Sequence, residues 1–196
     1  MIDVPALTTY FAVMSITPGP NNVLVTASGA AFGYRATLPH VLGIGIGAAL
    51  QMLLVALGAG LVFQRYPLLH TALAWGGAAY LLYLAWQLLN AGAVAAADAR
   101  RPFTIGQAIL FQAINPKAWV MAMTTAAVFI PRDTPLPHLV AAVGGTFLAV
   151  NMPCVSVWAL FGSGVRHLLL HPPYRRVFNL TMSTLLVMTA VLSLRG

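Results

Sequence analysis

Long stretches without a charged side chain are the feature that most limits how this 196-residue chain can fold. Six windows are long and apolar enough, or nearly so, to cross a hydrocarbon core, which takes about 20 residues of helix. They are apolar nearly all round, whereas a buried helix of a soluble protein has one apolar stripe. The sequence predicts an all-α polytopic membrane bundle of six transmembrane helices, at Val4–Gly29, Pro39–Phe63, Leu68–Gly92, Ile105–Pro131, Leu139–Gly162 and Val177–Leu194.

The composition leaves room for one membrane domain. Hydrophobic residues make up 60% of the chain and charged residues 7%, against about a quarter charged in soluble proteins. No polar stretch is long enough for a second, soluble domain. We therefore expect a single transmembrane domain over residues 1–196.

The arginines between the windows predict the orientation. Six against three favours the larger group as cytoplasmic, which places both termini outside. The net charge of +7 is then explained by topology and by contact with anionic membrane lipid. No basic run is interleaved with aromatics, so we predict no nucleic-acid partner. The larger group is Arg35, Arg100, Arg101, Arg166, Arg175 and Arg176, and the smaller is Arg65, Arg132 and Arg195.

Acidic residues are too few and too peripheral for most enzymes. The chain has no Glu, and Asp3, Asp98 and Asp133 lie outside the windows or at their edges. Paired catalytic carboxylates and an intramembrane Asp relay therefore have no residues to build from. His167 and His171 have helical i, i+4 spacing but no third ligand. We predict no enzyme, no metal and no cofactor.

Helix-breaking residues inside the windows point to a site. The first window holds Thr17-Pro18-Gly19-Pro20-Asn21-Asn22, whose prolines release the carbonyls of Met14 and Ile16 and whose glycine tolerates nearly any dihedral. The fourth holds Asn115-Pro116-Lys117 and the fifth Asn151-Met152-Pro153. Irregular backbone at membrane depth must be buried in protein or line a wet cavity. Three broken spans predict such a cavity, although Pro153 alone fits a kink as well as a site.

Lys117 is the charged residue deepest inside a predicted span. It lies about 18–21 Å of helix from either end, beyond the reach of a snorkelling lysine, about 6 Å. An intramembrane cation costs about 2.5–3.5 kcal/mol or more and needs a partner. No carboxylate lies within the spans, so we expect a substrate carboxylate to be that partner.

An internal repeat brings the breaks together. A shift of about 96 residues lays Pro20 on Pro116. Two halves of three spans each, approximately 1–95 and 100–196, must have opposite orientations, as in the inverted repeats of secondary transporters. Helix N-termini just after the two prolines would direct positive dipole ends at an anionic group.

Four segments together resemble the lysine/threonine exporter (LysE/RhtB) family over essentially the whole chain. They are Thr17–Asn22, Gly43–Gly47, Ala78–Trp86 and Asn115–Lys117. The resemblance implies six helices and export of amino acids across the bacterial inner membrane, coupled to the proton-motive force. The first-span motif and the third-span segment look most like the cysteine and O-acetylserine exporter branch, and this likeness thins after the fourth span.

We therefore predict a secondary-active exporter of small neutral amino acids or derivatives, such as cysteine, O-acetylserine, threonine or homoserine, with alternating access around a midplane site. Coupling could use a proton carried by Lys117 or the membrane potential alone. The alternative, a passive channel or inorganic-cation exporter, is weaker because Lys117 repels cations and no ring of polar side chains is present. The predicted substrate-binding residues are Thr17, Pro18, Gly19, Pro20, Asn21, Asn22, Asn115, Pro116, Lys117 and Asn151.

Glycines and aromatics have mainly structural interpretations. Gly29 and Gly33, like Gly43 and Gly47, have the spacing that lets helices approach closely, within the bundle or in a homo-oligomer. The larger aromatics are expected to be interfacial anchors or lipid-facing bulk. These are Trp75, Tyr80, Tyr83, Trp86 and Trp158.

Overall fold

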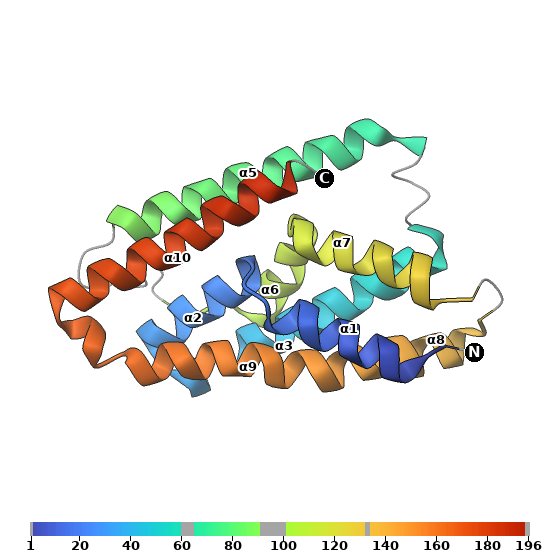
Figure 1. The fold of residues 1–196 in the computed structure, drawn as a ribbon, viewed down its shortest axis with the longest axis horizontal. Helices are drawn as coiled ribbons and strands as arrows, with labels where there is room; N and C mark the ends of the chain where they lie inside the picture. The colour runs from blue at the N-terminus through green and yellow to red at the C-terminus, as the bar shows by residue number, and fades with distance from the viewer. Residues whose placement is uncertain (1, 60–64, 91–100, 132–133, 195–196) are drawn as a thin grey trace.

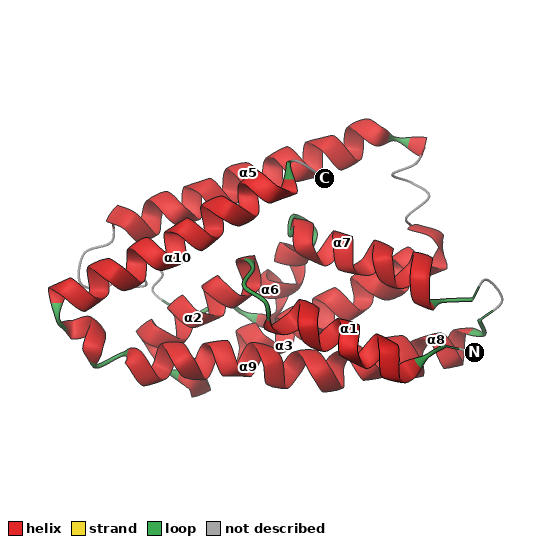
Figure 2. Cartoon of the chain, in the orientation of Figure 1, coloured by secondary structure: helices red, strands yellow, loops and turns green. Residues whose placement is uncertain are grey.

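Every regular element in the described residues, 2–59, 65–90, 101–131 and 134–194 of a computed structural model, is helical (Figures 1 and 2). The predicted all-α class is therefore confirmed. The α-helices are α1 (Val4–Ile16), α2 (Pro20–Phe32), α3 (Tyr34–Leu54), α5 (Pro67–Asn90), α6 (Ile105–Gln112), α7 (Pro116–Thr124), α8 (Leu136–Leu139), α9 (Thr146–Val165) and α10 (Pro172–Ser193). Short π-helices are η1 (Val55–Ala59), η2 (Thr125–Phe129) and η3 (Val140–Gly145), and a 3₁₀ turn is η4 (Leu168–Leu170).

Three helical stretches are long and apolar enough to cross a membrane without interruption: Tyr34–Gly58, Thr71–Asn90 and Leu136–Val165. The first predicted window is divided between α1 and α2, and the fourth between α6 and α7. The second predicted window begins at Pro39, but the helix begins five residues earlier, at Tyr34, and Pro39 lies inside it. The chain is a multi-pass helical membrane protein.

The helix pair α5 and α10 lies alongside the other long helices rather than among them (Figure 1). In the remaining bundle, α9 packs against α1, α2 and α3, while α3 also packs against α6 and α7. A buried cluster with Val23, Leu81, Phe111 and Leu186 joins the α5/α10 pair to α2 and α6. This cluster fixes the pair on one side of the interrupted helices.

Glycine determines how closely α2 and α9 approach. A Cβ atom on Gly29 would collide with the carbonyl of Ala159, and one on Gly162 would collide with that of Thr26. Both collisions are with backbone, which cannot turn away as a flexible side chain can. The two helices therefore pack backbone against backbone, and the predicted role of Gly29 is confirmed.

The second glycine pair packs α3 against α6. A Cβ on Gly47 would lie 2.8 Å from Cα of Ile109, and Gly43 meets the first turn of α6 in the same way. Gly33 does not take part in such packing. It occupies the turn between α2 and α3 with φ +83°, a conformation that favours glycine, so its predicted packing role was wrong.

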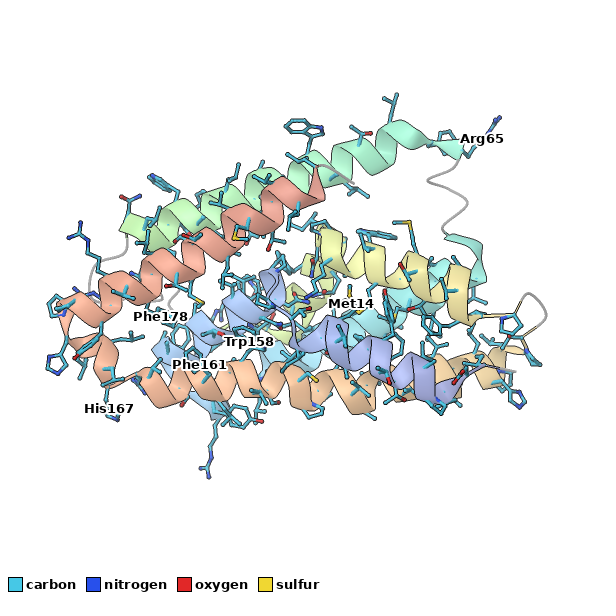
Figure 3. All side chains as sticks on the ribbon, in the orientation of Figure 1. Met14, Arg65, Trp158, Phe161, His167 and Phe178 are labelled. Carbon is cyan, nitrogen blue, oxygen red and sulfur yellow. The ribbon has the colours of Figure 1, made fainter. Side chains whose placement is uncertain are left out.

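Arginines of the two predicted groups lie at opposite ends of the molecule. Figure 3 shows Arg65 and His167 at opposite ends of the molecule. Arg166, next to His167, lines one cavity together with Arg101 and Arg175. These three therefore share an end, and its cytoplasmic placement remains a prediction. The predicted positions of Arg100, Arg132 and Arg195, and of Asp98 and Asp133, lie outside the described residues.

Three of the five aromatic side chains that were predicted to be anchors or lipid-facing bulk are exposed. Trp75, Tyr83 and Trp86 are among the exposed large side chains, as expected for lipid-facing residues. Tyr80 is half-buried, and its ring lies 5.8 Å from that of Phe111. Tyr80 is therefore not simply lipid-facing, because α5 turns this side toward α6, and a position at the interface stays a prediction.

Candidate functional site

The first and fourth predicted windows are each interrupted for three residues. Helix α1 ends at Ile16 and α2 begins at Pro20, while α6 ends at Gln112 and α7 begins at Pro116. Both breaks predicted from the prolines are confirmed, and they are offset by the same 96 residues at each edge. Proline suits the first position of a helix because its missing N–H would have no partner there.

The predicted third break does not occur. Helix α9 continues from Thr146 to Val165, with Pro153 inside it. One proline removes one backbone hydrogen bond, and a membrane helix accommodates this with its neighbours. At the fourth window a single proline, Pro116, does begin a new helix, and there Asn115 caps that helix by accepting from the backbone N–H of Lys117.

Lys117 crosses from the second break to the first. Its Nζ donates to the carbonyl oxygen of Thr17 at 2.7 Å, to Thr17 Oγ1 at 2.8 Å and to the carbonyl oxygen of Pro18 at 3.3 Å. The ammonium thus has three acceptors without any substrate present. All three are uncharged, so the positive charge itself has no anion beside it among these contacts.

Gly19 is required for room rather than for an unusual backbone. Its φ of −174° and ψ of 177° are extended values that any residue adopts, so the dihedral freedom expected from the sequence is not what it supplies. A Cβ at this position would lie 2.8 Å from Cδ of Lys117 and 3.2 Å from its Nζ. The missing side chain is the space in which Lys117 lies.

The two carbonyls freed by the prolines both have partners. Thr17 Oγ1 donates to the carbonyl oxygen of Met14 at 3.2 Å, and Trp158 Nε1 donates to that of Ile16 at 3.1 Å. The break is therefore closed by side chains. The sequence did not predict this contact of Trp158, because 142 residues separate it from Ile16, and its position at the interface or toward lipid stays a prediction.

Two buried asparagines continue the network around the first break. Asn22 Nδ2 donates to the carbonyl oxygens of Ser15 and Thr17, at 2.9 and 2.8 Å. Asn151, from α9, donates from Nδ2 to Ser15 Oγ at 3.0 Å. Its Oδ1 is buried and has no partner in the described part of the chain. An unsatisfied acceptor is thus left beside the break.

Gln112 connects the two breaks and was missed by the sequence reasoning. Its Oε1 accepts from Asn21 Nδ2 at 3.0 Å and from Asn115 Nδ2 at 3.3 Å, and its Nε2 donates to Asn21 Oδ1 at 3.3 Å. Asn115 Oδ1 in turn accepts from the backbone N–H of Lys117 at 3.2 Å and caps α7. An uncharged amide three residues before Asn115 in an apolar span was the available signal.

All ten predicted site residues lie in or beside this network. A cavity of about 30 Å³ is lined by residues of both breaks and of α9. That volume is about one water molecule's share of liquid water, too small for an amino acid. The network is therefore closed. The residues lining the cavity include Gly19, Pro20, Asn21, Asn22, Asn115, Lys117 and Asn151.

No group of three or more His, Cys, Asp or Glu side chains that could hold a metal ion occurs within the described ranges. His167 and His171 lie at the ends of η4, and the ring of His171 is in edge contact with Tyr174. The polar groups at the breaks are amides, hydroxyls, backbone carbonyls and one ammonium, which can bind a small zwitterion by hydrogen bonds.

A membrane bundle with two interrupted helices that meet in a polar network belongs to the class of transporter-like membrane proteins. Comparison with known proteins agrees. A family model described as LysE type translocator matches residues 12–196. The chain belongs to the LysE-type translocator family, as the four motifs indicated.

Several curated relatives cover nearly the whole chain. The cysteine/O-acetylserine efflux protein of Salmonella choleraesuis (strain SC-B67) is 31% identical over 191 residues, which is 95% of this chain and 94% of that protein. The protein of the same name from Klebsiella pneumoniae is 30% identical, covering 96% and 95%. That from Escherichia coli (strain K12) is 28% identical, covering 95% and 94%. No solved structure matches the chain significantly.

Proposed function

We propose that this protein is a secondary-active exporter of small neutral amino acids or derivatives across the bacterial inner membrane. Cysteine and O-acetylserine come from the names of its relatives, and threonine and homoserine are similar in size and charge. The observation that carries the proposal is the 2.7 Å hydrogen bond from Lys117 Nζ to the carbonyl of Thr17. It joins the breaks of two spans 100 residues apart.

Lys117 is the proposed carboxylate-binding group. Its present acceptors are two carbonyls and a hydroxyl, whereas a carboxylate is an anion and forms a stronger, charge-assisted hydrogen bond. A bound substrate would therefore displace the oxygens of Thr17 and Pro18 from the ammonium. Binding would loosen the tie between the two breaks, which couples occupancy to movement.

Asn151 is the proposed ammonium-binding group. Its Oδ1 is buried and unpartnered among the described residues, and a buried acceptor without a donor is costly. A substrate ammonium would supply that donor. No carboxylate lines the same cavity, so a lysine or arginine substrate would leave its side-chain charge unpaired, and neutral side chains are favoured.

Alternating access is the proposed mechanism, because a cavity of about 30 Å³ cannot hold an amino acid until the network opens. A 3+3 inverted repeat would exchange spans one and four, two and five, and three and six. The helix packing supports this: α1 and α2 pack on α9, α6 and α7 pack on α3, and α5 packs on α10. Each of these three sets of contacts is then matched under the exchange.

The path of the chain supports six crossings. In Figure 1, α9 leads away from the end of the molecule where the N-terminus lies, and α10 returns toward it. An even number of crossings places both termini on one side, as the arginine pattern predicts. Transport could be coupled to a proton carried by Lys117 or to the membrane potential alone, since the network contains no carboxylate.

Efflux from preloaded vesicles tests this function. Vesicles containing the protein should lose labelled cysteine, O-acetylserine, threonine or homoserine faster than protein-free vesicles, and an imposed gradient should change the rate. Selective loss of lysine or arginine would overturn the substrate class. Loss of inorganic cations, or equilibration that no gradient alters, would support a cation exporter or a passive channel instead.

A further inference from the structure

A second, larger cavity lies between α2, α5 and α10, apart from the two breaks. Its volume is about 520 Å³. Apolar side chains form much of its wall, among them Leu24 of α2, Leu84 and Leu88 of α5, and Phe178 and Leu186 of α10. A space this large and this apolar suits a hydrocarbon chain better than a small zwitterion.

Three arginines from separate segments line the same cavity. They are Arg101, just before α6, Arg166, at the end of α9, and Arg175, in the first turn of α10. Asp3 is the one acidic residue in the part of the chain that the structure describes, and it caps α1 through Ala6. The described residues thus offer these arginines no carboxylate, so an anion bound here would have no described acidic side chain beside it.

His40 supplies an independent sign of a missing partner. It also lines this cavity, is 1% exposed, and neither ring nitrogen has a hydrogen-bond partner among the described residues. Its ring lies 4.9 Å from that of Phe103, another lining residue. A buried imidazole without any hydrogen bond is costly, so the inner wall of the cavity offers a donor and an acceptor to an occupant.

We propose that this cavity binds an anionic phospholipid, with its phosphate among the three arginines and an acyl chain along the apolar walls of α2, α5 and α10. Guanidinium groups match phosphate with two parallel hydrogen bonds. The arginine-rich end is the predicted cytoplasmic end, where the leaflet carries anionic lipid and basic pockets between helices bind lipid headgroups. The lipid would hold the α5/α10 pair against the interrupted helices. This proposal does not depend on the transported substrate.

Lipid binding to the purified full-length protein tests it, with phosphatidylglycerol as the probe. The triple variant Arg101→Gln, Arg166→Gln, Arg175→Gln should bind phosphatidylglycerol at least about tenfold more weakly than the parent, because it removes the guanidinium groups that would bind the phosphate. The control Arg35→Gln, Arg65→Gln, Arg176→Gln removes the same charge outside the cavity and should change binding less than about threefold.

Control ligands and a second variant distinguish a lipid site from binding of free phosphate or of the substrate. Phosphatidylcholine should bind much more weakly, and neither inorganic phosphate nor cysteine should displace phosphatidylglycerol. Leu84→Trp fills the cavity while keeping every arginine, so it should also weaken lipid binding. It provides the test if the triple variant fails to fold. Equal losses in both triple variants, no preference over phosphatidylcholine, or displacement by inorganic phosphate or cysteine would overturn the lipid site.

Discussion

The two cavities of this protein use polar groups in opposite ways. At the breaks, nearly every polar atom has a partner: Lys117 bonds to Thr17, and Gln112 bonds to Asn21 and Asn115, leaving a space of about 30 Å³. The arginine-lined cavity is about 520 Å³, and His40 in its wall has no hydrogen-bond partner among the described residues.

This difference separates residues whose contacts must change when a ligand binds from residues that are already available to a ligand. A ligand at the breaks has to replace contacts that the protein already makes with itself, so its binding is coupled to a conformational change. A ligand in the arginine-lined cavity replaces no described ion pair. Substitutions at the breaks should therefore alter transport or stability, whereas matched substitutions elsewhere should do little.

Among three substitutions of residues that surround Lys117 or the breaks, Gly19→Ala is expected to have the largest effect. Its methyl group would lie 2.8 Å from Cδ of Lys117, so the lysine side chain must shift from the position in which it contacts the first break. Losing one partner of a desolvated charged hydrogen bond costs about 2–5 kcal/mol, so efflux should fall at least about 30-fold. Gly76→Ala is the control, because its methyl group meets open space. Equal efflux from both variants at matched protein levels would show that the lysine's position is unimportant.

Gln112→Leu should mainly lower stability. The leucine keeps most of the volume but leaves the amides of Asn21 and Asn115 short of a partner, at a cost of about 1–3 kcal/mol. Gln87→Leu is the matched change on α5, where the amide is exposed and donates to Tyr83. Thermal unfolding in detergent should place Gln112→Leu clearly below Gln87→Leu. The reverse order would mean that the hydrogen bonds of Gln112 stabilise the protein less than the exposed hydrogen bond between Gln87 and Tyr83.

Trp158→Phe should have the smallest effect of the three. It keeps an aromatic ring but removes the N–H that donates to the carbonyl of Ile16 at 3.1 Å. A neutral hydrogen bond contributes about 0.5–1.5 kcal/mol. Trp86→Phe, at a 61% exposed position on α5, should be close to neutral. Indistinguishable unfolding midpoints for the two variants would contradict a capping role for Trp158.

The sequence predicted where the helices break because that information is local. Two prolines around Gly19 remove backbone donors within one turn, whatever the rest of the chain does. The single Pro153 was overinterpreted, because one proline does not decide the outcome: α9 continues through Pro153, whereas α7 begins at Pro116. The membrane class was equally accessible, since it depends on the length and polarity of each window.

What fills the breaks could not be predicted, because it depends on contacts between distant segments. Trp158 donates a hydrogen bond to the carbonyl of Ile16, 142 residues away in the sequence. Gln112 accepts one from Asn21, 91 residues away. The sequence identified Gly19 as special but not why, since its importance is the space left for Lys117. The arginine-lined cavity likewise appears only when α2, α5 and α10 are packed together.

Efflux from vesicles that contain Lys117→Gln tests the role of Lys117 most directly. The variant should insert at least as well as the parent, because it removes a membrane charge, yet its efflux of the transported amino acid should fall about 30- to 4000-fold. Lys117→Arg should restore only part of the rate, and Arg65→Gln, at an exposed position, should be neutral. Near-normal efflux from Lys117→Gln would contradict carboxylate binding by this lysine and leave the amides and the broken-helix backbone as the site.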